Sequence, residues 1–520
     1  MTGIAAPALC LASGRAQRMI CCAALLVLLV PFPARAAVTC AALMQAFGSS
    51  LTDVNCFAST DLTTNNPLTT PANNALTPPL PAFAFTPQTD RNVISPNPPN
   101  RTPITKAVPG IQLDARIASD TQGQGRFLLR LPNDWNGRLV VAGASGTRSE
   151  FNGDFAWSDY VVQQGYAYAS QNKGVLNFFL VSVTSPTPPE PLACRLNPAS
   201  TVWVHFFDDD PGQPFTRWAD FMVKAAQLAR DGVQAAYGRP PLFTYAVGTS
   251  NGGYQVRRAV ESAPELFDGG VDWEGTFVDR HAPNLLTDLP PAILNFPDYV
   301  ASGFNPNSTA AKNIRAAGYP PDLISGTTSL WGLYSAQFWE VTQCQWQKRL
   351  DPAYDTYASG TGTYNYIGRL PFTDVGANVA AFATSGEIQR PLITVAGTMD
   401  ALLPIDHHAR AYARAVAAAA ERLNGGNGNN GNGNGNGTGN DKHPPAYRLY
   451  EVQNGNHIET FRDLLPQLEL IQPHAQRAFD LLVAHVERGM TLPPDQCIPH
   501  AAQISAVPAQ PGHCANLFAP

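Results

Sequence analysis

The sequence predicts an α/β fold built on a mostly parallel central sheet. Two observations lead to this prediction. Apolar and β-branched runs typical of buried strands alternate with helical segments along much of the chain. One of these runs, at 241–247, leads into the glycine-flanked turn Gly248-x-Ser250-x-Gly252 and then into helix-forming residues. With 520 residues, 44% of them hydrophobic and 14% charged, the chain can bury a large core.

The elements follow one another in a β-then-α rhythm. Apolar periodicity predicts strands at 111–118, 125–131, 138–142, 166–170, 241–249, 266–275, 390–400 and 447–452. Helical spacing and the absence of breakers predict helices at 41–47, 155–164, 218–234, 254–263, 406–422 and 473–488. Such alternation is typical of a parallel sheet covered by helices.

The N-terminus predicts export. Arg15 and Arg18 precede an apolar run at 20–30, and residues 34–36, Ala-Arg-Ala, have the form of a signal-peptidase site, so we expect cleavage after Ala36. The apolar run is short for a bilayer, and we expect no membrane span in the mature chain. Loss of residues 1–36 removes three arginines and no acid, which changes the net charge from −6 to −9. We therefore expect a secreted or periplasmic protein that does not bind nucleic acid.

Cysteine usage agrees with export. After residue 36 the chain has six cysteines, an even number that is expected to form disulfides in an oxidising compartment. Cys40–Cys56 and Cys497–Cys514 would each close a short loop near one end of the chain, which leaves Cys194–Cys344 as the third pair. Other pairings of the six cysteines stay open. The spacings lack a CxxC or zinc-type cluster, so we expect no metal site there.

Changes of pattern divide the mature chain into segments. They are a Pro-, Thr- and Asn-rich N-terminal extension at 37–106, a first part of the core at 107–275, an insertion at 276–389, a second part of the core at 390–490 and a C-terminal tail at 491–520. The insertion is rich in aromatic residues and proline and follows the strand after the serine turn. We expect it to lie over the carboxyl ends of the strands as a cap that shapes a binding cleft.

Two polar segments resemble ligand-binding loops in composition but lack the residues that such loops need. The Asn/Gly run at 424–440 lacks the Lys-Ser/Thr of a phosphate-binding loop, and we expect a disordered surface insert. The acidic run Asp208–Asp210 offers oxygen ligands for Ca²⁺ but no glycine-spaced ligand loop. We expect a solvated turn there.

The serine turn predicts a nucleophile. An abrupt strand-to-helix turn strains the backbone of the serine and leaves room only for glycine on either side of it. The segment 254–263 contains neither proline nor glycine, so strand, turn and helix follow in the required order. We expect the Oγ of Ser250 to stand clear of the sheet as a nucleophile, in preference to an ordinary glycine-rich loop.

Two later strand ends supply an acid and a base. The strand at 390–399 ends in Asp400, and the strand at 447–452 runs into a turn that carries His457. A serine hydroxyl is a poor nucleophile until an imidazole takes its proton, and a carboxylate must orient that imidazole. We therefore expect Ser250, His457 and Asp400 to form a catalytic triad that needs neither a metal nor an organic cofactor.

Other acids and histidines compete for these roles. Asp406 is expected to cap the following helix, whereas Asp272 and Glu274 follow the strand after the serine turn and remain the alternative acid. The other histidines of this region lie in the first turns of an expected helix or beside the Asn/Gly insert, namely His407, His408 and His443.

A tetrahedral intermediate also needs two N–H donors. One is expected from Asn251, the residue after the nucleophile, and the other from the loop after the third strand. That loop begins with Gly143, Ala144 and Ser145, whose amides are the candidates. Which of them donates is left open.

These motifs resemble those of the α/β-hydrolase superfamily over residues 111–488, and the Ser, Asp, His chain order is the one expected of it. The Gly-x-Ser-x-Gly-Gly turn, the six cysteines and the long cap most resemble the tannase and feruloyl esterase family. That family has cysteines directly before the serine and directly after the histidine, where this chain has Thr249 and Ile458. A second resemblance, through Ser-Asn-Gly at the turn, is to secreted hydrolases of hydroxyalkanoate oligomers and polyesters.

The residues and the resemblance together imply a secreted serine ester hydrolase. The expected substrate is a small or oligomeric ester, either phenolic as in tannases and feruloyl esterases or of another carboxylic kind. Hydroxyalkanoate oligomers and polyesters are the first alternative, and a peptide or amide bond is the second, because one triad serves both bonds. The third is an inactive binding protein on a hydrolase fold, since fold does not guarantee function.

Overall fold

The computed structural model describes residues 39–71, 86–92, 94–146, 148–207, 215–354, 363–425 and 445–520. The expected signal peptide, the acidic run at 208–210, His443 and most of the Asn/Gly insert lie outside these residues.

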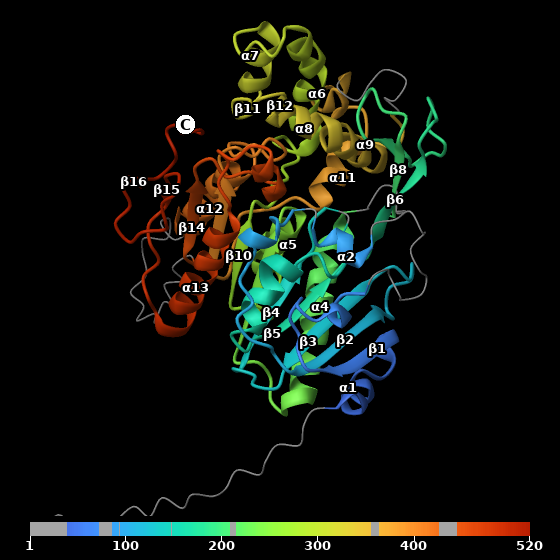
Figure 1. The fold of residues 1–520 in the computed structure, drawn as a ribbon, viewed down its shortest axis with the longest axis vertical. Helices are drawn as coiled ribbons and strands as arrows, with labels where there is room; N and C mark the ends of the chain where they lie inside the picture. The colour runs from blue at the N-terminus through green and yellow to red at the C-terminus, as the bar shows by residue number, and fades with distance from the viewer. Residues whose placement is uncertain are drawn as a thin grey trace, which may run out of the picture. The chain divides into compact units, whose positions relative to one another are not determined.

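An eleven-stranded sheet forms the centre of the fold, in the order β1-β2-β3-β5-β4-β9-β10-β13-β14-β15-β16 (Figure 1). All neighbours from β5 to β15 pair in parallel, and the pairs nearer the two edges are antiparallel. The strands are β1 (Leu51–Ser59), β2 (Gly110–Ile117), β3 (Arg126–Pro132), β4 (Arg138–Gly143), β5 (Ala167–Gln171), β9 (Phe243–Thr249), β10 (Gly269–Trp273), β13 (Leu392–Gly397), β14 (Tyr447–Val452), β15 (Gln496–Ile498) and β16 (Gln510–Pro511). This is the α/β-hydrolase fold that the sequence predicts.

Helices cover both faces of the sheet, which explains why its central parallel strands, such as β4 and β13, are largely apolar. Successive residues of a strand point to opposite faces. Accordingly, Leu139 and Val141 of β4 join one core cluster, and Val140 joins another. The first face is covered by α1 (Cys40–Phe47), α4 (Thr216–Tyr237), α5 (Asn251–Ser262) and α12 (Ala409–Gly425), and the second by α3 (Asp159–Val162) and α13 (Gln472–Arg488).

Both ends of the described chain extend the sheet further than the sequence predicts. The extension was expected to be irregular apart from one short helix; that helix is present as α1, but β1 also pairs with β2. In the tail, β15 and β16 add two short strands at the other edge. The helix expected at 155–164 begins as a π-helical turn and continues as α3.

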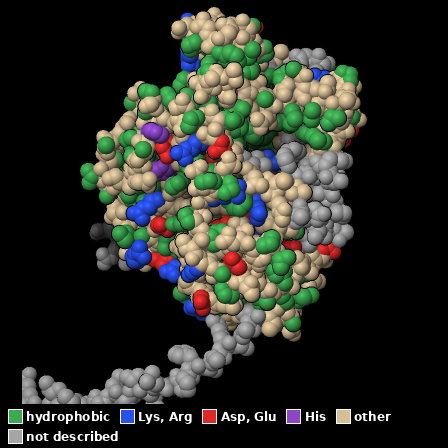
Figure 2. Space-filling model, in the orientation of Figure 1, with side chains coloured by type: hydrophobic (Ala, Val, Ile, Leu, Met, Phe, Trp, Pro, Cys, Tyr) green, Lys and Arg blue, Asp and Glu red, His purple; other side chains and the backbone are tan. Residues whose placement is uncertain are grey.

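Residues 276–389, for which the sequence predicts a cap, form a group of helices with one small sheet. It consists of α6 (Leu285–Ala301), α7 (Thr309–Ala316), α8 (Leu330–Gln337), α9 (Trp339–Leu350), α10 (Tyr366–Arg369), α11 (Val375–Ala381) and a two-stranded sheet of β11 (Ile324–Ser325) and β12 (Thr328–Ser329). Figure 1 shows these helices beyond the carboxyl ends of the parallel strands. On the face seen in Figure 2, charged side chains are concentrated over the sheet region, and the cap presents mainly hydrophobic and uncharged side chains.

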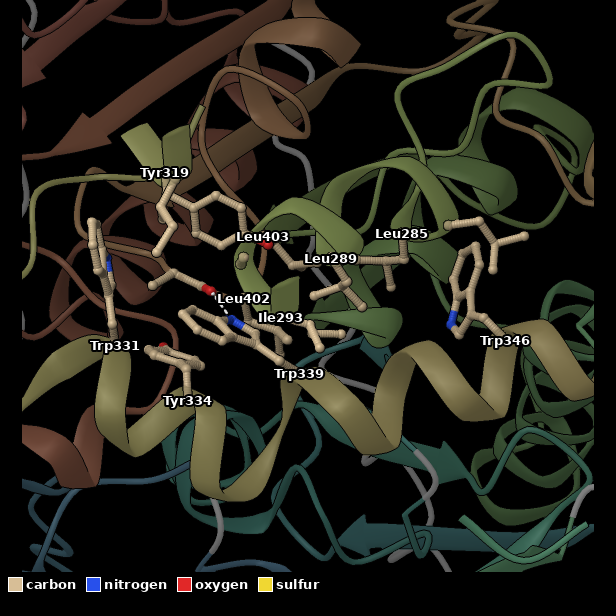
Figure 3. Packing of buried hydrophobic residues seen from close by; sticks show 14 of the residues in the cluster. Leu285, Leu289, Ile293, Tyr319, Trp331, Tyr334, Trp339, Trp346, Leu402 and Leu403 are labelled. Atoms are coloured by element: carbon tan, nitrogen blue, oxygen red, sulfur yellow. Dashed lines mark hydrogen bonds between the residues drawn. The ribbon is translucent and has the colours of Figure 1, made fainter. Parts of the chain in front are cut away.

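The cap has its own aromatic core, which reaches the loop after β13. Trp331, Tyr334 and Trp339 are buried there, and Figure 3 shows Trp339 packed between helix α6 and that loop. The Nε1–H of Trp339 donates a hydrogen bond of 2.6 Å to the carbonyl oxygen of Ala401. The cap is therefore attached directly to the loop that begins with Asp400.

A small sheet precedes α4, in a stretch that the sequence predicts only as an interruption. It consists of β6 (Leu176–Ser182), β7 (Cys194–Arg195) and β8 (Trp203–Phe207). The disulfide Cys194–Cys344 joins it to α9, and Cys40–Cys56 and Cys497–Cys514 are also formed, so all three expected pairings are confirmed. Among the described residues, no helix combines the length and the apolar character that crossing a bilayer requires.

Candidate active site

Ser250 occupies the tight turn between β9 and α5, with φ of 59° and ψ of −123°. Glycine is required around it. A Cβ atom on Gly248 would lie 2.3 Å from the carbonyl oxygen of Gly252, and one on Gly252 would lie 2.6 Å from that of Gly143. The left-handed φ of a non-glycine residue, held in place by this close packing, is the geometry of a nucleophile elbow.

His457 and Asp400 are in direct contact. The Nδ1 of His457 lies 2.8 Å from Oδ2 of Asp400, and both side chains are buried. The other carboxylate oxygen of Asp400 accepts the backbone N–H groups of Leu402 and Leu403, each at 2.7 Å. Asp400 thus has three hydrogen-bond partners, and its contact with Nδ1 leaves Nε2 as the ring nitrogen of His457 that does not face the carboxylate.

A second carboxyl group reaches the same imidazole. Oε2 of Glu274 lies 3.4 Å from Nδ1 of His457, and Oε1 accepts the N–H of Gly397 at 3.0 Å. Burial, and then the charge of Asp400, raise the pKa of Glu274 well above its usual value. The raised pKa favours the protonated form of Glu274 beside Asp400.

The other acids named as alternatives have different partners. Asp272 forms a buried ion pair with Arg257, whose Nε lies 2.6 Å from its Oδ2, and also accepts the N–H of Gly275. Asp406 pairs with Arg410 at 3.0 Å. Neither carboxylate is available to orient His457.

His407 and His408 both contact a carboxylate of the cap helix α6. Their nearest distances to Asp288 are 3.0 Å and 3.3 Å. The Nδ1 of His408 also accepts the N–H of Phe277 at 3.0 Å. These contacts connect the cap to the loop after β13 and give the two histidines a structural role.

One cavity brings Ser250 and His457 together beneath the cap. Its walls are mainly apolar, with Leu285, Phe338, Trp346 and Leu402 among the described lining residues. The polar lining includes Gln337, Thr342, Gln345 and Arg148, and the described lining residues include no Asp or Glu. Such a cavity suits an uncharged or anionic organic molecule.

The prediction for the second N–H donor needs correction. The N–H of Ala144 donates to Oε1 of Gln255 at 3.0 Å, and Gly143 packs against Gly252 instead of lining the cavity. The sequence missed this because the competing acceptor comes from α5. The N–H of Ser145 donates to Oδ1 of Asn152 at 3.1 Å. Asn251 and Gly146 line the cavity, which makes the amide of Gly146 a further candidate for the second donor.

Glu274, Asp400 and His457 offer ligand atoms within 4.8 Å of one another, a spacing that a metal ion can use. In this structure the side chains of Asp400 and Glu274 already form hydrogen bonds within the protein. Asp400 accepts the proton of His457 Nδ1 and two amide protons, and Glu274 accepts the N–H of Gly397. The contacts fit an oriented imidazole better than a metal centre.

Comparisons relate this chain to known ester hydrolases. A family model described as 3HB-oligomer hydrolase matches residues 371–516. A D-(-)-3-hydroxybutyrate oligomer hydrolase of Burkholderia thailandensis is 29% identical over 143 residues, which cover 26% of this chain and only 17% of that relative. The relative of Burkholderia mallei strain SAVP1 is 28% identical over the same length.

Two solved structures are similar at low identity. Feruloyl esterase B from Aspergillus oryzae has 12% identity and a TM-score of 0.45, with 85% of this chain and 88% of that chain covered. Tannin acyl hydrolase from Aspergillus niger also has 12% identity and a TM-score of 0.45, with 87% of each chain covered. The family-model match begins after Ser250 and includes Asp400 and His457, so the chain is similar to 3HB-oligomer hydrolases through its second part.

Proposed function

We propose that this protein is a secreted serine hydrolase of carboxylic esters, with Ser250 as nucleophile, His457 as base and Asp400 as the orienting acid. One observation carries the proposal. A serine in elbow geometry and an imidazole bonded to a buried carboxylate line the same cavity. The three disulfides support export of the chain.

The mechanism follows from the roles of these groups. Nε2 of His457 takes the proton of Ser250 as Oγ attacks the ester carbonyl, and Asp400 stabilises the imidazolium that forms. The amides of Asn251 and Gly146 donate to the developing oxyanion. His457 then returns the proton to the leaving alcohol, and water, activated by the same imidazole, releases the acid from Ser250.

The proposed substrates are short oligomers of 3-hydroxybutyrate or related hydroxyalkanoates. The similarity of residues 371–516 to 3HB-oligomer hydrolases favours this class over phenolic esters. The apolar side chains of the cavity, such as Leu285 and Leu402, suit aliphatic chains. Thr249 and Ile458, in place of the two cysteines typical of tannases, also count against that family.

The first experiment tests the triad on a neutral reporter ester. Wild-type protein and the variants Ser250→Ala and His457→Ala are assayed on p-nitrophenyl butyrate, with Ser262→Ala, an exposed serine of α5, as matched control. We expect each triad variant to lose about 10³-fold or more of kcat, and the control to match wild type. Equal activity in all four proteins would refute the triad.

A second assay identifies the bond and the substrate class. The dimer of 3-hydroxybutyrate, a feruloyl ester and a peptide anilide are compared at equal concentration. We expect the dimer to give the highest kcat/KM. Preference for the anilide would support a peptidase, and failure on every substrate, with all proteins folded, would support a binding protein on a hydrolase fold.

A further inference from the structure

We propose that Arg148 binds the carboxylate of an acid-terminated ester, so that the enzyme prefers substrates with a free carboxylate end over their neutral esters. This inference rests on the proposed function and adds to it the charge of the substrate. It is carried by the position of Arg148 in the wall of the cavity that Ser250 and His457 share.

The loop after β4 brings Arg148 to the site. The same loop supplies Ser145 and Gly146 to the lining, so the cation lies on the side of the cavity where we propose an oxyanion donor. The side chain of Arg148 is only 11% exposed. A guanidinium held in a largely apolar wall interacts more strongly with an anion than one in water does, and its planar fork fits a carboxylate.

Asp90 holds this guanidinium from outside the lining. Its Oδ1 lies 3.5 Å from Nε of Arg148, and its Oδ2 accepts the N–H and the hydroxyl of Ser149 at 2.6 Å and 2.8 Å. The carboxylate of Asp90 also interacts with the charge of Lys173. Asp90 therefore fixes the position of this guanidinium in the cavity wall.

The rest of the lining matches the body of such a substrate. Ile94, Leu196 and Leu285 provide apolar contact for an aliphatic chain. The described lining includes no carboxylate that would repel an anionic end. A molecule with an aliphatic ester body and one terminal carboxylate therefore satisfies both the apolar wall and Arg148.

The test compares one ester in two charge states. The dimer of 3-hydroxybutyrate and its methyl ester are the two substrates, and kcat/KM on each is measured for wild type, Arg148→Gln and Arg148→Lys. Arg422→Gln, which removes an exposed arginine paired with Glu387, is the matched control. We expect wild type to prefer the acid, and Arg148→Gln to lower the acid-to-methyl-ester ratio about 10-fold or more, mainly through KM.

The charge-preserving variant Arg148→Lys is expected to retain part of the preference, and Arg422→Gln all of it. Circular dichroism and thermal melts check that each variant is folded. Wild-type preference for the methyl ester, or an unchanged ratio in Arg148→Gln, would overturn the role of Arg148.

A binding measurement separates this inference from the proposed function. Titration calorimetry with the acid dimer uses Ser250→Ala and Ser250→Ala/Arg148→Gln, which cannot turn over by the proposed mechanism. We expect Kd to rise about 10-fold when Arg148 is removed. An equal Kd for the two variants overturns the carboxylate site, even when wild type hydrolyses p-nitrophenyl butyrate. If wild type hydrolyses no ester, the proposed function is overturned, even when Arg148 binds the acid.

Discussion

At the scale of single residues, two carboxyl groups compete for one imidazole, and their surroundings separate their roles. Asp400 lies 2.8 Å from Nδ1 of His457 and accepts two backbone amides, whereas Glu274 lies 3.4 Å away. Burial and the charge of Asp400 raise the pKa of Glu274, which favours the protonated form of Glu274. Glu274 is therefore a positioning residue.

This assignment predicts unequal effects of two isosteric substitutions. Asp400→Asn removes the charge that stabilises the imidazolium, and we expect kcat on p-nitrophenyl butyrate to fall about 10³- to 10⁴-fold. Glu274→Gln keeps the size of the side chain and an acceptor for the N–H of Gly397, so we expect a loss below about 10-fold. The reverse order of the two effects would make Glu274 the orienting acid.

The residues of the proposed triad could be selected from the sequence because the carboxyl ends of parallel strands meet at one edge of a sheet. The sequence could not assign the second oxyanion donor, since the Ala144 amide is engaged by Gln255, which lies 111 residues further along the chain. The distinction between Asp400 and Glu274 also required coordinates. Both follow strands, and only burial and contacts show which is charged.

At the scale of elements, a buried acid holds the start of α13. Oε1 of Glu459 accepts the N–H groups of Ile471 and Gln472 at 2.6 Å and 2.7 Å. Burial raises the pKa of Glu459 to about 8, although these two hydrogen bonds oppose the shift. Glu459 thus holds a proton more tightly in the folded protein than in the unfolded chain.

The sign of the pH effect follows. Between the unfolded pKa, about 4.3, and the folded value, the folded state binds more protons, so this group's contribution to the free energy of unfolding falls as the pH rises. Glu459→Gln keeps an acceptor for both amides and does not titrate. The free energy of unfolding is measured by urea denaturation at pH 5.5 and at pH 8.5. We expect it to fall more between these pH values in wild type than in Glu459→Gln, by up to a few kcal/mol. Glu421→Gln changes an exposed residue of α12 and serves as control, and its free energy of unfolding should depend on pH as in wild type. If Glu459→Gln also showed the wild-type pH dependence, Glu459 would not titrate in this range.

The strands that the sequence did not predict are either ordered by a partner strand far along the chain or very short. β1 has a largely polar, exposed face and gains its order from pairing with β2 and from the disulfide of Cys56. β15 and β16 have three and two residues, too few for a periodic pattern. Long strands with buried faces, such as β9 and β13, were predicted because burial on both faces selects apolar residues along their whole length.

At the scale of the whole described chain, the cavity has walls from segments that are far apart in sequence. Leu196 and Val204 come from the small sheet, and Val341, Thr342 and Trp346 come from α9. The disulfide Cys194–Cys344 crosses between these two walls. The cleft can therefore be altered without changing the triad, which belongs to strand ends of the large sheet.

Removal of this disulfide should affect substrate binding more than chemistry. In Cys194→Ser/Cys344→Ser the two walls can separate, and we expect the KM for the hydroxybutyrate dimer to rise several-fold with kcat nearly retained. The bond closes a loop across 150 residues, so its loss should also lower the free energy of unfolding by about 5 kcal/mol in the chain-entropy model. Cys40→Ser/Cys56→Ser removes a disulfide that ties α1 to β1, with a separation of 16 residues, and serves as control. It should destabilise the protein and leave KM unchanged, because neither cysteine is among the described residues that line the cavity. Equal KM values in the two double variants would mean that the cap keeps its wall in place through its aromatic core around Trp339 alone.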